Sequence, residues 1–354
     1  MKKRAMSVFI AVCLIGTLTT GCGSSKTPTQ NDSPATPPAA ASSGEQAAPA
    51  GGEKIRLTAG LVNAVDHPFT IGMQTFAKYV SEATDGQIEI EVFPANQLGE
   101  ERDITAGLTE GTIDFCLNAN GELSKRVDGY AIGDAPYLFS GPDQMQKTVM
   151  GDTFQEFHKE LLDNYGIRVL SSFYLGTRHV TSGTKPIRTP EDLKGFKIRV
   201  PDQPPSVNAF EVLGANPTPV PFGELYLALQ QGVVEGQENS FGQILGSKVQ
   251  EVQKYLSLTG HVVQNLYLTI SEKTYQKLTP EQRAIIEELA VKIADEVTAE
   301  MIELEQTEQL QTLKDAGMEV IEVDQDAFRQ VALANMPANG FFDMELYKRI
   351  QEAD

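Results

Sequence analysis

The sequence predicts an α/β protein built of two domains. Strand-like and helix-like segments alternate through the first half of the chain, which indicates a sheet with helices on both faces. A second series of alternating segments begins near Arg178. About 300 residues follow the low-complexity segment near the N-terminus, which is more than one typical core holds and enough for two domains.

The first unit is predicted from the spacing of its apolar residues. Short runs of alternating or continuous apolar residues indicate strands, and longer segments with apolar residues three or four apart indicate amphipathic helices. In chain order we predict strand 55–60, helix 69–84, strand 88–93, helix 100–109 and strand 113–117.

The second unit contains a short strand with an arginine in it. Residues 197–200 alternate charged and apolar side chains after Gly195, and Pro201 ends the strand because proline cannot continue a ladder. By residue type alone, Arg199 is expected to be a solvated edge residue. The other predicted elements of this unit are helix 206–213, strand 218–220, helix 222–231 and strand 267–271.

One long helix is predicted over residues 280–316. Thr279 is a suitable N-cap, Pro280 suits the first helical position, and Gly317 is a typical stop. From the pattern alone, a coiled-coil segment is the alternative. The apolar stripe of this helix is predicted to comprise Ile285, Leu289, Ile293 and Val297.

The N-terminus has the features of an export signal. A basic start, an apolar run too short for a membrane span and a small-residue cleavage site predict a signal peptide over residues 1–22. Cys22 follows small residues as in a lipoprotein signal, although Thr19 stands where leucine is usual, so we predict a lipid anchor on Cys22. The alternative is an ordinary signal peptide. Residues 23–52 are rich in Ser, Thr, Pro, Ala and Gly and are predicted to form a disordered tether.

The composition limits the partners. The whole chain carries a formal charge of −19, and without the three cations of the signal peptide it has 26 basic and 48 acidic residues, or −22. This excess of negative charge argues against binding nucleic acid or an anionic membrane surface, so contact with a membrane is predicted only through the anchor. Cys13 lies in the signal peptide and Cys22 is the predicted anchor, so the exported domain keeps only Cys116 and no internal disulfide is expected.

Signals for catalysis are weak. The chain has no HExxH, GxSxG or CxxC motif and no phosphate-binding loop, and its four histidines are scattered. Glu235 and Glu238 have no nucleophile or metal ligand nearby in the sequence, and we interpret Glu238 as the structural partner of a nearby cation. We therefore predict neither an enzyme nor a cofactor or metal site.

Residues 54–350 contain several segments that together resemble one family. They include TDGQIEIEVFPANQLGEERD, GTIDF, APYLF, GTRHVTS, LKGFKIRVP and LGANPTPVPFGELYLALQQGVVEGQEN. In this order they are similar to solute-binding proteins of tripartite ATP-independent periplasmic (TRAP) transporters, the dicarboxylate-binding (DctP) family. The resemblance implies a type II-like periplasmic-binding-protein fold, with a hinge, a ligand cleft between the domains and a long helix across both. Domain I is expected to comprise 53–176 and 265–304, and domain II 177–264 and 305–354.

The resemblance also implies a ligand site. Arg199 matches the arginine that pairs with a ligand carboxylate in this family, since a guanidinium fork fits that group in plane. Arg178 and Asn239 match further polar contacts, and Phe222 matches an aromatic residue that packs on the ligand. Additional candidates that could face the cleft are Glu101, His67, Asn118, Asn63 and Asn120.

The expected function is capture of a small organic acid outside the cytoplasm and its delivery to a TRAP membrane permease. The same binder could instead present its ligand-bound form to a sensor kinase. An exported enzyme and a structural or adhesive lipoprotein are the remaining alternatives. A monocarboxylate, a dicarboxylate, a keto acid and an acidic sugar all remain open as ligands.

Overall fold

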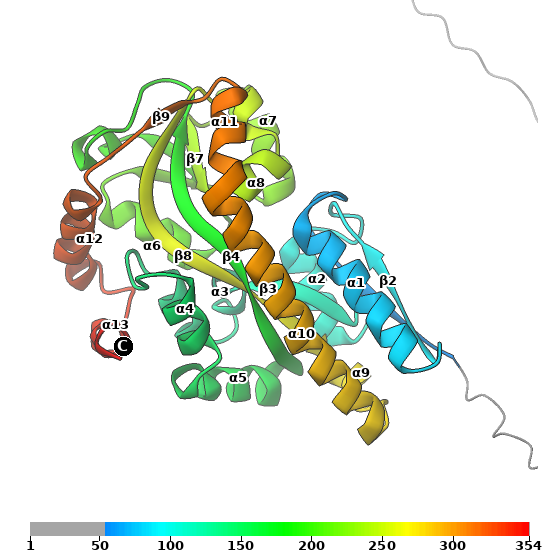
Figure 1. Cartoon of the computed structure of the whole chain (residues 1–354). Helices are drawn as coiled ribbons and strands as arrows, with labels where there is room; N and C mark the ends of the chain where they lie inside the picture. The colour runs from blue at the N-terminus through cyan, green and yellow to red at the C-terminus, as the bar shows by residue number, and fades with distance from the viewer. Residues whose placement is uncertain (1–53, 354) are drawn as a thin grey trace, which may run out of the picture. The chain divides into compact units, whose positions relative to one another are not determined.

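The computed structural model describes residues 54–353, so the predicted signal peptide, the tether and Cys22 lie outside the described residues. Within this range, strands form one mixed sheet in the order β2-β1-β3-β8-β4-β7-β5-β6, and β9 pairs with β8 (Figure 1). The strands are β1 (Ile55–Gly60), β2 (Ile88–Phe93), β3 (Phe115–Ala119), β4 (Ile167–Ser182), β5 (Lys197–Val200), β6 (Asn216–Pro219), β7 (Gly236–Asn239), β8 (Tyr255–Ser271) and β9 (Glu319–Ile321). The α-helices are α1 (Pro68–Ala83), α2 (Glu101–Glu110), α3 (Asn120–Leu123), α4 (Pro142–Val149), α5 (Asp152–Tyr165), α6 (Pro204–Val212), α7 (Leu225–Gln230), α8 (Phe241–Gly246), α9 (Glu272–Tyr275), α10 (Pro280–Leu304), α11 (Leu310–Asp315), α12 (Gln325–Asn339) and α13 (Met344–Glu352).

The first unit has the predicted order of strands and helices, and its three strands are parallel. β1 pairs in parallel with β2 on one side and with β3 on the other, and α1 and α2 connect these strands. The bounds of β1 and β2 agree with the prediction, but β3 begins two residues later than expected. The reason is that the N–H groups of Thr112 and Ile113 both donate to Gly107 O and close the end of α2.

Two long strands connect the halves of the sheet. β4 and β8 pair antiparallel over almost their whole lengths, and β8 also pairs with β3 while β4 pairs with β7. The register shifts at three places along the β4–β8 pair, and both strands are visibly curved in Figure 1. The prediction found only residues 267–271 of β8, because polar residues and glycine interrupt the apolar pattern of both strands.

The second unit adds three short strands at the other end of the sheet. β5 pairs in parallel with β6 and with β7. α6 connects β5 to β6, and a 3₁₀ turn (Phe222–Glu224) followed by α7 connects β6 to β7. The single helix predicted over 222–231 is therefore divided into a 3₁₀ turn and an α-helix. β5 places Ile198, Arg199 and Val200 in buried positions and leaves Lys197 exposed.

The predicted long helix is confirmed and crosses the sheet along β4 (Figure 1). It comprises α10, a π-helical segment (Glu305–Gln309) and α11, and Thr279 caps its start together with Gln282. The buried stripe differs from the prediction at its start, where Ile286 and Ala290 are buried rather than Ile285 and Leu289.

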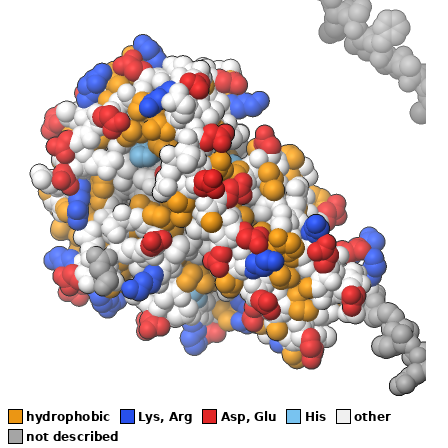
Figure 2. Space-filling model, viewed as in Figure 1, with side chains coloured by type: hydrophobic (Ala, Val, Ile, Leu, Met, Phe, Trp, Pro, Cys, Tyr) orange, Lys and Arg blue, Asp and Glu red, His pale blue; other side chains and the backbone are white. Residues whose placement is uncertain are grey.

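Charged side chains are dispersed over the face of the molecule that Figure 2 shows. On the face shown in Figure 2, Lys and Arg side chains are separated by acidic and apolar ones rather than gathered in one patch. No helix among residues 54–353 combines the length and the apolar character that crossing a membrane would require.

Candidate functional site

A cavity of about 100 Å³ lies where the first and second units meet, with room for several water molecules or a small ligand. Its walls come from α2, β3 and α3 on one side and from β4, β5, β7 and the Phe222–Glu224 turn on the other. The lining residues are Val62, Asn63, Glu100, Glu101, Arg102, Leu117, Ala119, Glu122, Lys125, Leu175, Arg178, Arg199, Pro201, Asp202, Gln203, Pro221, Phe222, Asn239, Gln243, Gln264 and Leu266.

Arg199 is a buried cation that has no ion-pair partner among residues 54–353. Its side chain is 1% exposed, and its Nε and Nη2 donate to Val220 O at 2.9 and 2.6 Å. Nη1 is buried and has no hydrogen-bond partner. Among the residues that the structure describes, no carboxylate lies within 4.0 Å of this guanidinium. Burial lowers the pKa of Arg199 to about 10, which reflects the cost of holding the charge there.

Arg178 is held by protein groups. Its Nε donates to Glu238 Oε2 at 2.5 Å and its Nη2 to Glu238 Oε1 at 2.8 Å, while Nη1 donates to Gln264 Oε1 at 2.6 Å. His261 Nε2 lies 3.0 Å from Glu238 Oε2. Burial acts to raise the pKa of Glu238, but Arg178 and His261 outweigh it and lower the pKa to about 2. The interpretation of Glu238 as the partner of a cation is confirmed.

Asn239 and Phe222 also line the cavity. Asn239 ends β7, and its Oδ1 accepts a hydrogen bond from Ser240 N at 3.1 Å. Phe222 begins the 3₁₀ turn directly after Pro221, which also lines the cavity. The site therefore combines two arginines, an amide and an aromatic ring on the side of the second unit.

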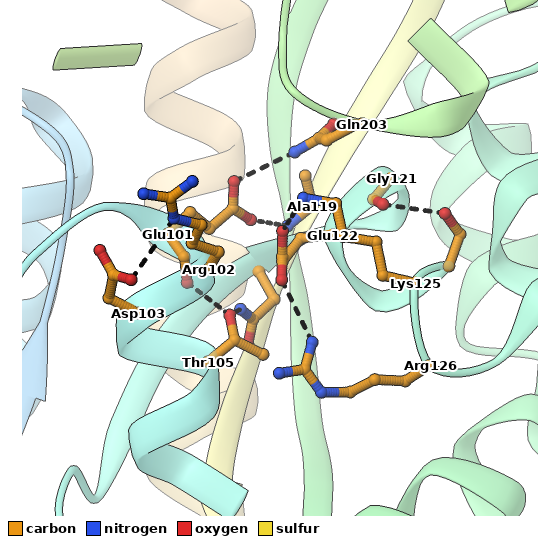
Figure 3. A network of polar contacts seen from close by, with 12 residues as sticks. Glu101, Arg102, Asp103, Thr105, Ala119, Gly121, Glu122, Lys125, Arg126 and Gln203 are labelled. Atoms are coloured by element: carbon orange, nitrogen blue, oxygen red, sulfur yellow. Dashed lines mark hydrogen bonds and ion pairs between the residues drawn. The ribbon is translucent and has the colours of Figure 1, made fainter. Parts of the chain in front are cut away.

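Glu101 stands on the opposite side, at the start of α2 (Figure 3). Its Oε1 accepts a hydrogen bond from Ala119 N at 2.8 Å, and its Oε2 accepts one from Gln203 Nε2 at 3.1 Å. Burial, and then the neighbouring Glu122, raise the pKa of Glu101 to about 8. Glu122 itself has two cations, Lys125 at 2.9 Å and Arg126 at 3.1 Å.

Several contacts join the two sides of the cavity. Besides the bond from Gln203 to Glu101, Gly223 N donates to Glu100 Oε2 at 3.3 Å and Asn63 Nδ2 donates to Gln243 Oε1 at 3.3 Å. A Cβ at Gly223 would lie 2.4 Å from Glu100 Oε1, so the close contact between residue 223 and Glu100 requires glycine at this position. Hydrogen bonds therefore link the two walls of the cavity directly.

Two predicted residues lie away from the cavity wall. Asn118 alternates with Leu117 and Ala119 on β3, and since these two neighbours face the cavity, Asn118 faces the other way. It donates to Thr105 Oγ1 at 2.7 Å and accepts from Thr269 Oγ1 at 2.6 Å. His67 caps α1, where its Nδ1 accepts from Phe69 N at 3.2 Å, and burial lowers its pKa to about 4.

Sequence reasoning missed part of the polar lining. Gln264 lies in the stretch of β8 that was not predicted as strand, and Gln203 precedes α6 in a segment rich in proline. Of the further candidates, Asn63 lines the cavity, whereas Asn120 is hydrogen-bonded to Asn265 and Tyr267. A correct prediction of the strand register of β8 would have identified Gln264 as a residue that lines the cavity.

The chain is similar to known proteins over most of its length. The family model described as bacterial extracellular solute-binding protein, family 7 (DctP) matches residues 59–338. The sialic acid-binding periplasmic protein SiaP of Vibrio cholerae is 34% identical over 254 residues, which cover 72% of this chain and 78% of SiaP.

Two solved structures show the same fold with ligands. The TRAP periplasmic solute-binding protein of Roseobacter denitrificans with bound L-galactonate is 30% identical, with a TM-score of 0.80 over 85% of this chain and 98% of that one. The corresponding protein of Polaromonas sp. JS666 bound to D-erythronate is 31% identical, with a TM-score of 0.79 over 84% and 98%. The predicted two-domain fold is thus confirmed, and so is the expectation of a binding protein rather than an enzyme. The chain belongs to family 7 of the bacterial extracellular solute-binding proteins, the DctP family of TRAP transporter receptors.

Proposed function

We propose that this protein is the extracytoplasmic receptor of a TRAP transporter, and that it captures a small organic acid by pairing the acid's carboxylate with Arg199. The observation that carries the proposal is the buried Arg199 guanidinium, which lines a cavity shared by both units and has no carboxylate partner among the described residues. A buried charge is costly unless it is paired, so a ligand anion supplies the missing partner.

The guanidinium has donors to spare for such an anion. Arginine has five N–H donors, and Val220 O takes one from Nε and one from Nη2. Both Nη1 hydrogens and the second on Nη2 remain, which suffice for a two-point pair with a carboxylate. Arg178 contributes positive potential, but Glu238 already neutralises its charge. Asn239 and Phe222 would supply an amide contact and an apolar surface for the ligand body.

The ligands named for the relatives support an acid. SiaP is named for sialic acid, and the two solved structures hold L-galactonate and D-erythronate. Each of these molecules has a carboxylate and several hydroxyl groups.

Ligand capture would be coupled to closure of the two domains. The domain division predicted above puts 53–176 and 265–304 in one domain and 177–264 and 305–354 in the other. The chain then passes from one domain to the other within β4, β8 and the long helix. A ligand that contacts both sides of the cavity favours the closed form, since it binds that form more tightly. The closed form would then be the one that delivers the acid to the membrane permease.

The location follows from the same role. A receptor of this kind works outside the cytoplasm, which agrees with the export signal at residues 1–22. We propose that Cys22 carries the lipid anchor and that residues 23–52 tether the binding domains to it. Mass spectrometry of the protein purified from its membrane fraction would detect the acyl groups on Cys22.

A paired ligand screen tests the central role. The thermal unfolding of the protein is measured with a panel of organic acids and with the neutral amide of each acid. A ligand at a hundred times its dissociation constant adds about 2.7 kcal/mol to stability. Stabilisation by an acid but not by its amide is expected, whereas stabilisation by amides or by no acid would contradict the proposal.

A further inference from the structure

The side-chain amide of Gln264 connects Arg178 to a buried carboxylate outside the ligand cavity. Gln264 Oε1 accepts a hydrogen bond from Arg178 Nη1 at 2.6 Å, and Gln264 Nε2 donates one to Asp134 Oδ1 at 2.9 Å. All three side chains are buried. Gln264 and Arg178 line the cavity, whereas Asp134 borders a separate chamber of about 10 Å³. A ligand in the cavity would therefore meet Gln264 and Arg178 but not Asp134.

The two partners of Gln264 fix the orientation of its amide. An amide can turn over and exchange its oxygen and nitrogen, but arginine only donates hydrogen bonds and an ionised carboxylate only accepts them. Burial raises the pKa of Asp134 to about 6, although Gln264 and Arg178 act to lower it, so the carboxyl is ionised at pH 7.5. The oxygen of Gln264 must then face Arg178, and its nitrogen must face Asp134.

Protein groups take four of the five N–H groups of Arg178. Nε and Nη2 donate to the carboxylate and the carbonyl oxygen of Glu238, and Nη1 gives one hydrogen to Gln264. Because all three nitrogens are held, the direction of the second Nη1 hydrogen is fixed. Among residues 54–353, Nη1 has no second acceptor, and Arg178 lines the cavity. This hydrogen is the single donor that Arg178 can offer to a ligand oxygen.

We propose that Asp134 is a positioning residue for ligand binding. By accepting a hydrogen bond from Gln264 it keeps the Gln264 oxygen on Arg178, and Arg178 then directs its free Nη1 hydrogen at an oxygen of the ligand. The inference rests on the proposed function. It gives the 3₁₀ helix Asp128–Asp134 a part in binding, although no residue of that helix lines the cavity.

The hydrogen bond of Asp134 can be separated from its charge. Alanine at position 134 removes the acceptor, which leaves Gln264 Nε2 buried and unpaired, so the amide gains by leaving Arg178 to find another acceptor. Asparagine keeps an oxygen that can accept from Gln264 and removes the negative charge. That charge repels an anionic ligand, so its removal alone does not weaken binding of an acid.

Calorimetry of the full-length protein at pH 7.5 tests the inference, with L-galactonate and D-erythronate as probes. The variants are Asp134→Ala, Asp134→Asn, Gln264→Leu and the double variant of Asp134→Ala with Gln264→Leu. Asp128→Ala is the matched control, since Asp128 is the exposed first residue of the same 3₁₀ helix. Thermal unfolding without ligand sets a temperature at which every variant is folded, and Asp134→Leu replaces Asp134→Ala if the latter does not fold.

Loss of one hydrogen bond changes an affinity by about two- to tenfold. Asp134→Ala and Gln264→Leu are each expected to bind about threefold or more weakly than the wild type, whereas Asp134→Asn and Asp128→Ala should bind at least as tightly as the wild type. Because Asp134 acts through Gln264, the double variant should bind about as well as Gln264→Leu alone.

Three results would overturn the inference: wild-type affinity in Asp134→Ala, an equal loss in Asp134→Asn and Asp134→Ala, or additive losses in the double variant. Arg199→Ala, measured in the same series, separates this failure from that of the proposed function. If Arg199→Ala still loses affinity, the proposed function stands without the role of Asp134. If the wild type binds neither acid, or Arg199→Ala binds as the wild type does, the proposed function fails and the inference fails with it.

Discussion

Arg178 and Glu238 form a two-point ion pair between adjacent antiparallel strands, and this pair distinguishes the two arginines of the cavity. Both side chains are buried, and their contacts measure 2.5 and 2.8 Å. Arg178 is thereby neutralised within the protein, whereas the Arg199 guanidinium, among residues 54–353, donates only to the carbonyl oxygen of Val220. The proposed pairing with a ligand carboxylate therefore falls to Arg199 rather than to Arg178.

The first prediction concerns that ion pair. Arg178→Ala is expected to lower the free energy of unfolding by about 3 to 5 kcal/mol, because it leaves the buried Glu238 carboxylate without its cation. Urea unfolding monitored by circular dichroism measures the loss. Arg188→Ala is the control, since Arg188 is 58% exposed and 3.8 Å from Glu319. Arg188→Ala should lower the free energy of unfolding by less than about 1 kcal/mol. An equal decrease in the two variants would contradict the structural role of Arg178.

The second prediction concerns the stability of the ligand-free protein as a function of pH. The pKa of Glu101 is raised from 4.5 to about 8, so between these values the folded state retains a proton that the unfolded state has lost. Stability contributed by this group therefore falls as the pH rises from 4.5 to about 8 and is constant above that range. Glu101→Gln should remove this decrease, so that the variant gains stability relative to the wild type as the pH rises. Urea unfolding from pH 5 to 9 measures the difference in unfolding free energy between Glu101→Gln and the wild type. A difference that does not change with pH would show that the pKa of Glu101 is not raised in the folded state.

The third prediction concerns the contact between α1 and the long helix. A Cβ at Gly72 would lie 2.5 Å from Val297 Cγ2, and Val297 is buried. Gly72→Ala is expected to destabilise the protein by about 1 to 3 kcal/mol through overpacking. Val297→Ala removes the obstructing methyl groups, so the double variant should lose less than the sum of the two single losses. A double-mutant cycle of unfolding free energies measures this coupling, and additive losses would show that the two positions do not meet.

The fourth prediction concerns closure over the cavity. Gly223→Val places a side chain against Glu100 and Asn96, which face it from the opposite side. The variant is expected to bind its acid at least fivefold more weakly, with little change in stability without ligand, because the closed form is the one obstructed. Gly141→Val is the control, since a Cβ there meets nothing within 4 Å. Small-angle scattering should show that ligand compacts the wild type and the control more than Gly223→Val, and equal compaction would contradict the role of this contact.

The sequence predicted the fold best where one face of an element is apolar at a regular spacing. β1 and β2 have such patterns, and their bounds were predicted to the residue. β4 and β8 lie in the middle of the sheet, where Ser171, Gly176 and Asn265 interrupt the pattern while their pairing partners supply the stability. The full length of these strands could not be predicted from local spacing, because it depends on pairing between distant segments.

The candidate site was predictable only in part. The resemblance of residues 196–240 to the family identified Arg199, Asn239 and Phe222, and all three line the cavity. Asn118 was placed at a strand end that could face the cleft, but the register of β3 turns it toward Thr105 and Thr269. A shift of one residue along a strand reverses the side that a side chain faces, and the predicted bounds of β3 did not resolve that.

The most direct test of the account is the affinity of Arg199→Ala for the acid that the ligand screen identifies, measured by calorimetry beside Arg188→Ala and the wild type. Loss of a partner from a buried charge pair typically costs about 2 to 5 kcal/mol, so the affinity of Arg199→Ala should fall at least tenfold. Arg188→Ala should bind as the wild type does. An Arg199→Ala variant that is folded and retains wild-type affinity would contradict the claim that this arginine holds the ligand carboxylate.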